Sequence, residues 1–212
     1  MCETRFIERH DSLITFVELF SCVSIALREI ANSSARSSST ASTLLAAVEK
    51  SEFLISLTIC ESLLSVTLPL SRFLQEKSTD LVGASKHASS VIQCFKAMQK
   101  NVDMEFNRIF VSASTLARNV SGADLKLPRI AGKTKQTVEQ YYSESLFVRC
   151  LSHLIDNIES RFESNVETFR AFQILLHGHA SVDKTAELEV LSSYLKQNIN
   201  LLKQNINCGA SK

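Results

Sequence analysis

Apolar residues recur every three or four positions along most of this chain, which is the spacing of one face of an α-helix. The longest stripe keeps its phase from Leu81 to Val120, and no proline or glycine interrupts it between Gly83 and Gly122. The pattern predicts a single helix of roughly 60 Å at the usual rise per residue. A break near Asn101 is the alternative.

Shorter stripes predict the other helices. Asp11 is a favourable N-cap, so the first helix should run from Asp11 to Ala31. A second stripe runs from Leu44 to Leu68, and Pro69 should break or kink it because proline removes a donor and clashes with the preceding turn. A short helix should follow past Pro69. The remaining predicted helices cover residues 138–162, 166–176 and 183–207.

The composition agrees with this picture. The 212 residues include only five glycines and two prolines, residues on which tight turns depend. A chain with so few turn-forming residues is better suited to long helices than to sheets. The predicted fold class is therefore all-α, a long-helix bundle with little or no sheet.

Two segments lack the helical period. Residues 33–43 hold eight Ser or Thr in eleven positions, which predicts a flexible linker. Residues 121–137 contain Gly122, Pro128 and Gly132, which predict the main loop. We expect one helical domain over residues 1–177 and a divergent C-terminal helix over residues 178–212.

The main loop is also the clearest patch of one charge. The net charge of the chain is only +1, so any contact with nucleic acid must be local. Between Leu125 and Val138 there is no acidic residue, and the loop carries four cations: Lys126, Arg129, Lys133 and Lys135. Such a cluster can contact phosphates and release counterions, which predicts a DNA partner. An ordinary solvated loop is the alternative.

The pair Arg5-Phe6 is a second candidate for nucleic-acid binding. A guanidinium can hold a phosphate while an aromatic ring stacks on a base. The alternative is that Phe6 and Ile7 cover the end of the first helix.

No pattern predicts an enzyme. The chain has no GxSxG elbow and no glycine-rich phosphate loop. The pairs His177 with His179 and Cys150 with His153 lack the spacing of zinc sites. We therefore expect no catalytic residue, no metal, no cofactor and no small-molecule substrate.

The six cysteines form no CxxC pair, and most have apolar neighbours at helical spacing. This usage favours a reducing compartment, either nuclear or cytoplasmic. The most apolar run, Phe53 to Leu70, contains Glu61, Pro69 and several hydroxyl residues. It favours a buried helix over a membrane span.

The last predicted helix contains a direct repeat, in which LKQNIN at residues 195–200 recurs at residues 202–207. Its apolar positions have heptad spacing, which is also the spacing of a self-association seam. These positions are Leu188, Leu195, Ile199, Leu202 and Ile206. Two heptads are short for a coiled coil, so the pattern favours a peripheral helix that packs on its own domain, and self-association is the alternative.

Several segments resemble a known family. Residues 2–12, CETRFIERHDS, resemble a CETRW-ERHDS signature of hAT-superfamily transposases. Domesticated relatives with this signature include the zinc finger MYM-type proteins and the THAP-type repressor of the inhibitor of the protein kinase. Other matching segments follow in the same order. They are EFLISL at 52–57, LPLSRFLQEKSTDL at 68–81, LPR at 127–129, YY at 141–142 and ESRF at 159–162.

The resemblance covers about residues 2–175 and implies the helical insertion of a ribonuclease-H-like transposase domain. It also implies that the three catalytic acids lie outside this chain. The family has Trp where Phe6 stands, and often Asp where Ser152 stands. The predicted function is a catalytically inactive, transposase-derived fragment that retains nucleic-acid binding. A helical protein–protein interaction scaffold or dimerisation module without DNA binding is the alternative.

Overall fold

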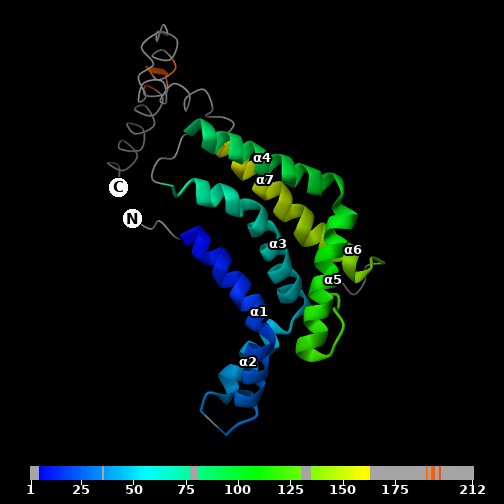
Figure 1. Cartoon of the computed structure of the whole chain (residues 1–212). Helices are drawn as coiled ribbons and strands as arrows, with labels where there is room; N and C mark the ends of the chain where they lie inside the picture. Colours follow the sequence, from blue (N-terminus) through cyan, green and yellow to red (C-terminus); the bar gives the residue numbers. More distant parts are fainter. Residues whose placement is uncertain are drawn as a thin grey trace, which may run out of the picture.

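The computed structural model describes residues 5–34, 36–76, 81–129 and 135–162, with residues 190, 192, 193 and 196 of the C-terminal tail. These residues form helices and connecting loops without a strand, which confirms the predicted all-α class. Figure 1 shows the helices. They are α1 (Arg5–Ala31), α2 (Ser38–Val48), α3 (Ser51–Phe73), α4 (Leu81–Lys100), α5 (Val102–Ser121), α6 (Val138–Tyr142) and α7 (Val148–Phe162).

Helix α3 lies at the centre of the bundle and packs against α1, α2, α4 and α5. By length and composition it is the one described helix that could cross a membrane, with a mean hydropathy of 1.8. However, Leu54, Ile55 and Ile59 of α3 are at most 2% exposed and belong to the hydrophobic core. This placement agrees with the predicted buried helix.

Helix α3 also continues through Pro69, so the break predicted there is wrong. Pro69 is exposed, whereas the next residue, Leu70, is buried in the core. Burial of Leu70 favours one more helical turn, and this tertiary packing outweighs the backbone hydrogen bond that proline cannot donate.

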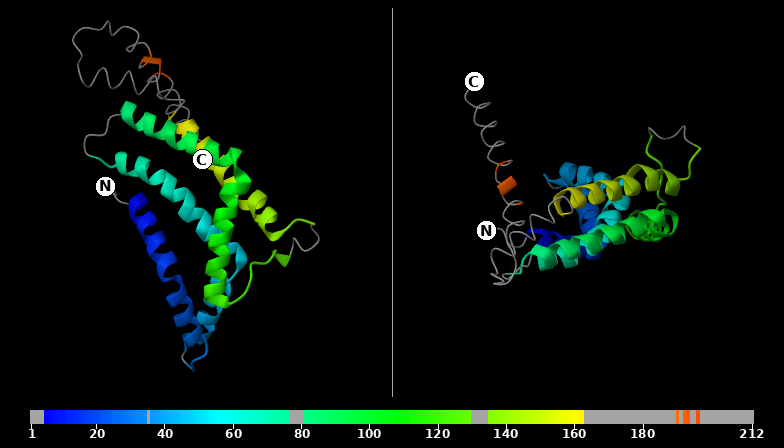
Figure 2. Two further views of the ribbon diagram at one scale, coloured as in Figure 1. Left: turned by 45° about the vertical axis from the view of Figure 1, so that its right-hand side comes forward. Right: turned by 90° about the horizontal axis from the view of Figure 1, so that it is seen from above.

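The single long helix predicted over residues 81–120 is wrong, because Asn101 separates α4 from α5. Its backbone leaves the helical region at φ −118° and ψ 38°. The Asn101 side-chain amide donates to the carbonyl of Ala97 at 3.1 Å, and the Asn101 carbonyl accepts from the amide of Glu105 at 3.0 Å. The break therefore leaves both helix ends hydrogen-bonded and lets α4 and α5 follow the surface of α3 (Figure 2).

The predicted helix over residues 138–162 is confirmed as a continuous helical stretch. Thr137 and Gln140 form a reciprocal capping box that starts it. A π-helical turn, Ser143–Phe147, joins α6 to α7. Helix α7 then lies beside α4 (Figure 2), where Lys96 pairs with Glu159.

Two N-terminal boundaries need correction. Helix α1 begins at Arg5, so Asp11 lies inside it and is not its N-cap. The linker predicted over residues 33–43 is wrong in its second half, where α2 begins at Ser38. The hydroxyls of Ser42 and Thr43 donate to carbonyls four residues earlier, at 2.9 and 3.0 Å. Serine-rich composition is thus compatible with a helix that packs on α1.

Candidate nucleic-acid interface

The predicted basic loop connects α5 to α6. Gly122 ends α5 in the left-handed conformation, with φ 67°, and its amide donates to the carbonyl of Arg118 at 3.0 Å. Glycine is the residue that adopts this conformation without steric cost. The described part of the loop comprises residues 122–129 and 135–137.

The folded core fixes the backbone of this loop at Lys126. The amide of Lys126 donates to Ser51 Oγ at 2.8 Å, which ties the loop to the first residue of α3. The Tyr142 hydroxyl donates to the Lys126 carbonyl at 3.2 Å. Leu125 is 8% exposed and packs in the core. The loop therefore has a defined backbone position where its cations begin.

The described cations of the loop remain available to solvent. Lys126, Arg129 and Lys135 are exposed, and none has an ion pair within the described part of the chain. Arg118, at the end of α5, differs because it pairs with Asp124 at 3.1 Å. Lys133 lies outside the described residues.

Tyr142 keeps its proton over a wide pH range. Burial, the negative charge of Glu52 and the neighbouring Tyr141, in that order of size, together raise its pKa to about 12. The phenol therefore stays a neutral donor to the Lys126 carbonyl at physiological pH. The anchor of the loop does not depend on a titrating group.

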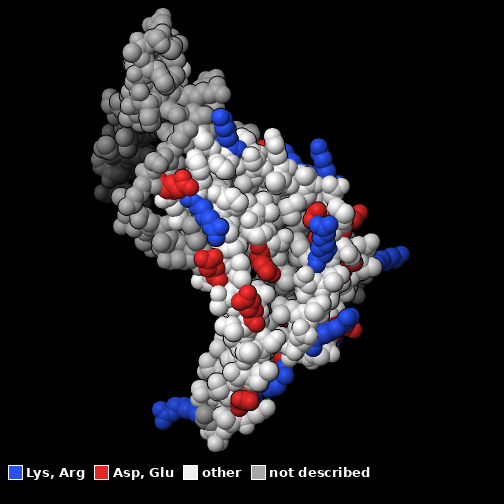
Figure 3. Space-filling model, in the orientation of Figure 1, with Lys and Arg blue, Asp and Glu red and all other residues white. Residues whose placement is uncertain are grey.

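The positive charge is local. On the face seen in Figure 3, Lys and Arg side chains alternate with Asp and Glu and do not merge into one broad patch. This distribution agrees with the net charge of +1. A nucleic-acid contact on this molecule would therefore have to rest on a few residues, as the sequence predicted for the loop.

The structure does not bring Arg5 and Phe6 to the basic loop. Both residues lie in the first turn of α1, and their side chains lie outside the described part of the structure. Helix α1 begins near the end of α3, whereas Lys126 contacts the first residue of α3 (Figure 1). The length of α3 separates these places by roughly 30 Å. The two predicted sites are distinct.

Other predicted positions lie elsewhere or outside the described residues. The heptad positions Leu188, Leu195, Ile199, Leu202 and Ile206 and the pair His177 and His179 are among the latter. Cys150 and His153 are exposed on α7, and the described residues contain no group of three or more metal-ligating side chains. Apolar neighbours in the sequence do not bury the described cysteines, because Cys22, Cys60, Cys94 and Cys150 are exposed and free.

A pocket that no sequence pattern predicted lies between α1, α3 and α5, and its lining includes His10 and Glu61. One sequence signal was available. Glu61 is the only acidic residue between Phe53 and Leu70, the most apolar run of the chain. A single carboxylate on a core helix marks a place where the helix meets a polar environment.

Comparison with known proteins gives two similar sequences. The chain is 22% identical over 189 residues to the 52 kDa repressor of the inhibitor of the protein kinase of Mus musculus, covering 82% of this chain and 25% of that protein. The Homo sapiens protein of the same name is 23% identical over the same lengths. The chain thus spans about a quarter of these relatives. No protein-family model and no solved structure matches it.

Proposed function

We propose that this chain is derived from a hAT transposase, has no catalytic activity of its own, and binds nucleic acid through the basic loop. The similarity to the repressor supports the first part, because that repressor is among the domesticated relatives named by the sequence resemblance. The insertion-domain assignment and a nuclear or cytoplasmic location are parts of this proposal. The basic loop supports the binding function.

The observation that carries the binding function is the combination of a fixed backbone with free cations. Lys126 is held by Ser51 and Tyr142 through its main chain, so its side chain loses no contact when it meets a phosphate. Arg129 and Lys135 are likewise exposed without an ion pair among the described residues. Cations that are not neutralised within the protein release counterions from the nucleic acid when they bind.

The direct test replaces the four loop cations, Lys126, Arg129, Lys133 and Lys135, by Ala and measures binding to single- and double-stranded DNA by fluorescence anisotropy at low salt. The backbone contacts of Lys126 do not require its side chain, so the variant should fold. We expect affinity to fall by about tenfold or more.

A matched control removes the same charge elsewhere. Arg36, Arg72, Lys86 and Lys100 are exposed outside the loop, and replacing them by Ala lowers the net charge by the same four units. We expect this control to bind within about threefold of the original chain. Equal losses in the two variants would reduce the proposal to a general charge effect, and unchanged binding of the loop variant would contradict it.

An interaction scaffold is the second candidate function. Leu19 and Ile25 on α1 are 51% and 54% exposed, and Leu44 on α2 is 49% exposed. Large exposed apolar side chains on adjacent helices favour protein association. A sedimentation measurement that finds a stable dimer, together with no DNA binding, would favour this function over the first.

A further inference from the structure

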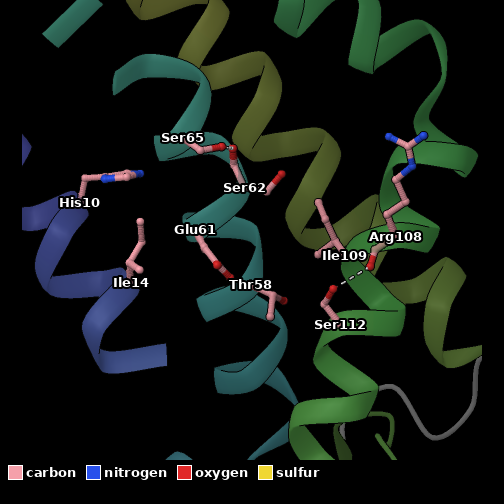
Figure 4. Close-up of a pocket in the computed structure, with 9 residues that line it drawn as sticks. All are labelled: His10, Ile14, Thr58, Glu61, Ser62, Ser65, Arg108, Ile109 and Ser112. Carbon is pink, nitrogen blue, oxygen red and sulfur yellow. Dashed lines mark hydrogen bonds between the residues drawn. The ribbon is translucent and has the colours of Figure 1, made fainter. Parts of the chain in front are cut away.

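A pocket of about 300 Å³ with both polar and apolar walls lies between α1, α3 and α5. Figure 4 shows its walls, with His10 from α1, Glu61 from the middle of α3 and Ser112 from α5 on different sides. The volume is at the lower end of the range for small-ligand sites. The pocket is separate from the basic loop, which meets α3 at Ser51.

His10 gives the pocket an unpaired hydrogen-bonding atom. Its side chain is only 7% exposed, and its Nδ1 lies 3.3 Å from Asp11 Oδ1. A carboxylate can only accept, so in the neutral imidazole Nδ1 carries the proton and Nε2 presents a lone pair. Nε2 is buried and has no hydrogen-bond partner among the described residues. In Figure 4 the ring extends from α1 toward α3.

Three of the four hydroxyls that line the pocket are also acceptors. Thr58, Ser65 and Ser112 each donate their proton to a carbonyl of their own helix, at 3.0, 2.7 and 3.1 Å. A hydroxyl whose proton is used can only accept a further hydrogen bond. The walls therefore offer oxygen lone pairs beside the lone pair of His10 Nε2.

Glu61 adds a negative charge to this set of acceptors. It is half-buried, and no hydrogen bond or ion pair reaches it within the described part of the chain. The cation on the α5 wall, Arg108, does not neutralise it. The Arg108 side chain is 71% exposed, lies 3.7 Å from Glu105 and extends away from His10 (Figure 4).

We propose that this pocket binds a small organic cation, an alkylguanidinium or alkylammonium group, which donates hydrogen bonds to His10 Nε2 and to the Glu61 carboxylate. Such a group brings a positive charge to Glu61, which Arg108 does not neutralise, and donors to the acceptors of the walls. A metal ion fits less well, because the described residues hold no group of three or more ligating side chains. The cation is either a free small molecule or a basic side chain of a peptide.

The test follows the His10 ring nitrogens by NMR in the ¹⁵N-labelled full chain during titration with butylguanidinium chloride. Butylurea serves as the neutral isostere, and sodium chloride matches the ionic strength. We expect saturable shifts of Nε2 with butylguanidinium, and a dissociation constant at least about tenfold higher with butylurea. Absent shifts, or equal binding of the two probes, would overturn the proposal.

Two substitutions locate the charge. Glu61→Gln keeps the size of the side chain and should weaken butylguanidinium binding by about tenfold or more. Glu18→Gln makes the same charge change on the exposed face of α1. It should change the dissociation constant of butylguanidinium by no more than about twofold. Equal weakening by both would overturn the proposal. The comparison of the two probes remains decisive if Glu61→Gln fails to fold.

The blocked peptide acetyl-Gly-Arg-Gly-amide identifies the source of the cation. If the peptide binds as tightly as butylguanidinium, the cation is a basic side chain of a partner, because the pocket then accommodates the flanking backbone. Binding of butylguanidinium alone supports a free small cation. Failure of both probes to shift Nε2 would contradict the proposal, and it would leave DNA binding by the basic loop untouched.

Discussion

The two sides of α3 differ in how they are packed. On the side of α4, α5 and α7, the fully buried side chains are large and apolar, as in Phe95, Phe106 and Phe147. On the side of the α1–α2 hairpin, Phe20 is the one large side chain that is fully buried among the described side chains. There α1 also buries His10 and Ser24, and each has one polar atom without a hydrogen-bond partner in the described parts of the chain.

The difference shows how stability and binding surfaces are divided. Apolar burial on the α4–α7 side stabilises the fold, since it removes aromatic surface from water. The basic loop is attached to this side through Tyr142 and to the start of α3 through Ser51. The hairpin contributes His10 to the pocket, and it carries the exposed apolar residues Leu19 and Ile25. Substitutions should therefore have unequal effects on the two sides.

The largest effect is expected for Phe147→Ala. The Phe147 ring is fully buried and lies 5.5 Å from the ring of Phe106, between centroids. Its loss leaves a cavity and should lower the free energy of unfolding by about 3 to 5 kcal/mol, measured by urea denaturation. Val111→Ala, at a site 55% exposed on α5, should cost less than about 1 kcal/mol. If both substitutions lower the free energy of unfolding by a similar amount, burial on the α4–α7 side is not what stabilises the fold.

A smaller effect is expected at alkaline pH. The pKa of Tyr142 is about 12 in the folded chain, above its ordinary value of 10.0, so the unfolded chain loses this proton first. Stability from this group is complete below pH 10 and is lost as the pH rises toward 12, by up to about 3 kcal/mol. The free energy of unfolding, measured with urea across this pH range, should therefore fall more steeply in the original chain than in Tyr142→Phe. Parallel profiles would show that the buried phenol is not responsible.

The smallest effect is expected at Ser24 on the hairpin. Its hydroxyl is buried and none of the described residues bonds to it, so Ser24→Ala should raise the free energy of unfolding by up to about 1 kcal/mol. Thr58→Val is the control, because the Thr58 hydroxyl is buried but hydrogen-bonded, and its removal should cost about 1 kcal/mol. If Ser24→Ala instead destabilises the chain in thermal unfolding, the hydroxyl has a partner in solution.

The helical class followed from the sequence because burial on one face requires a period of 3.6 residues, whichever partner covers that face. The ends of helices depended on tertiary packing and were less predictable. The apolar stripe from Leu81 to Val120 keeps its phase across Asn101, because α4 and α5 both bury residues of this stripe. The stripe therefore gives no sign that the chain turns between the two helices. Pro69 has the opposite effect, because burial of Leu70 maintains the helix that proline alone would interrupt.

The candidate sites show the same limit. Exposure of Lys126 and Arg129 was predictable from a loop without acidic residues, because solvated cations need no partner. The anchor from Ser51 to Lys126 joins residues far apart in the chain, and no local pattern encodes it. The pocket of His10 and Glu61 exists only after three helices have packed together, so its acceptors share no spacing in the sequence.

The salt dependence of DNA binding tests the central claim most directly. Binding constants of the original chain and the four-residue loop variant would be measured over a series of sodium chloride concentrations. If four loop cations contact phosphates, the slope of log K against log salt should be about −3 to −4 on duplex DNA for the original chain. The loop variant should have a slope near zero. Equal slopes for the two chains would contradict binding through the basic loop.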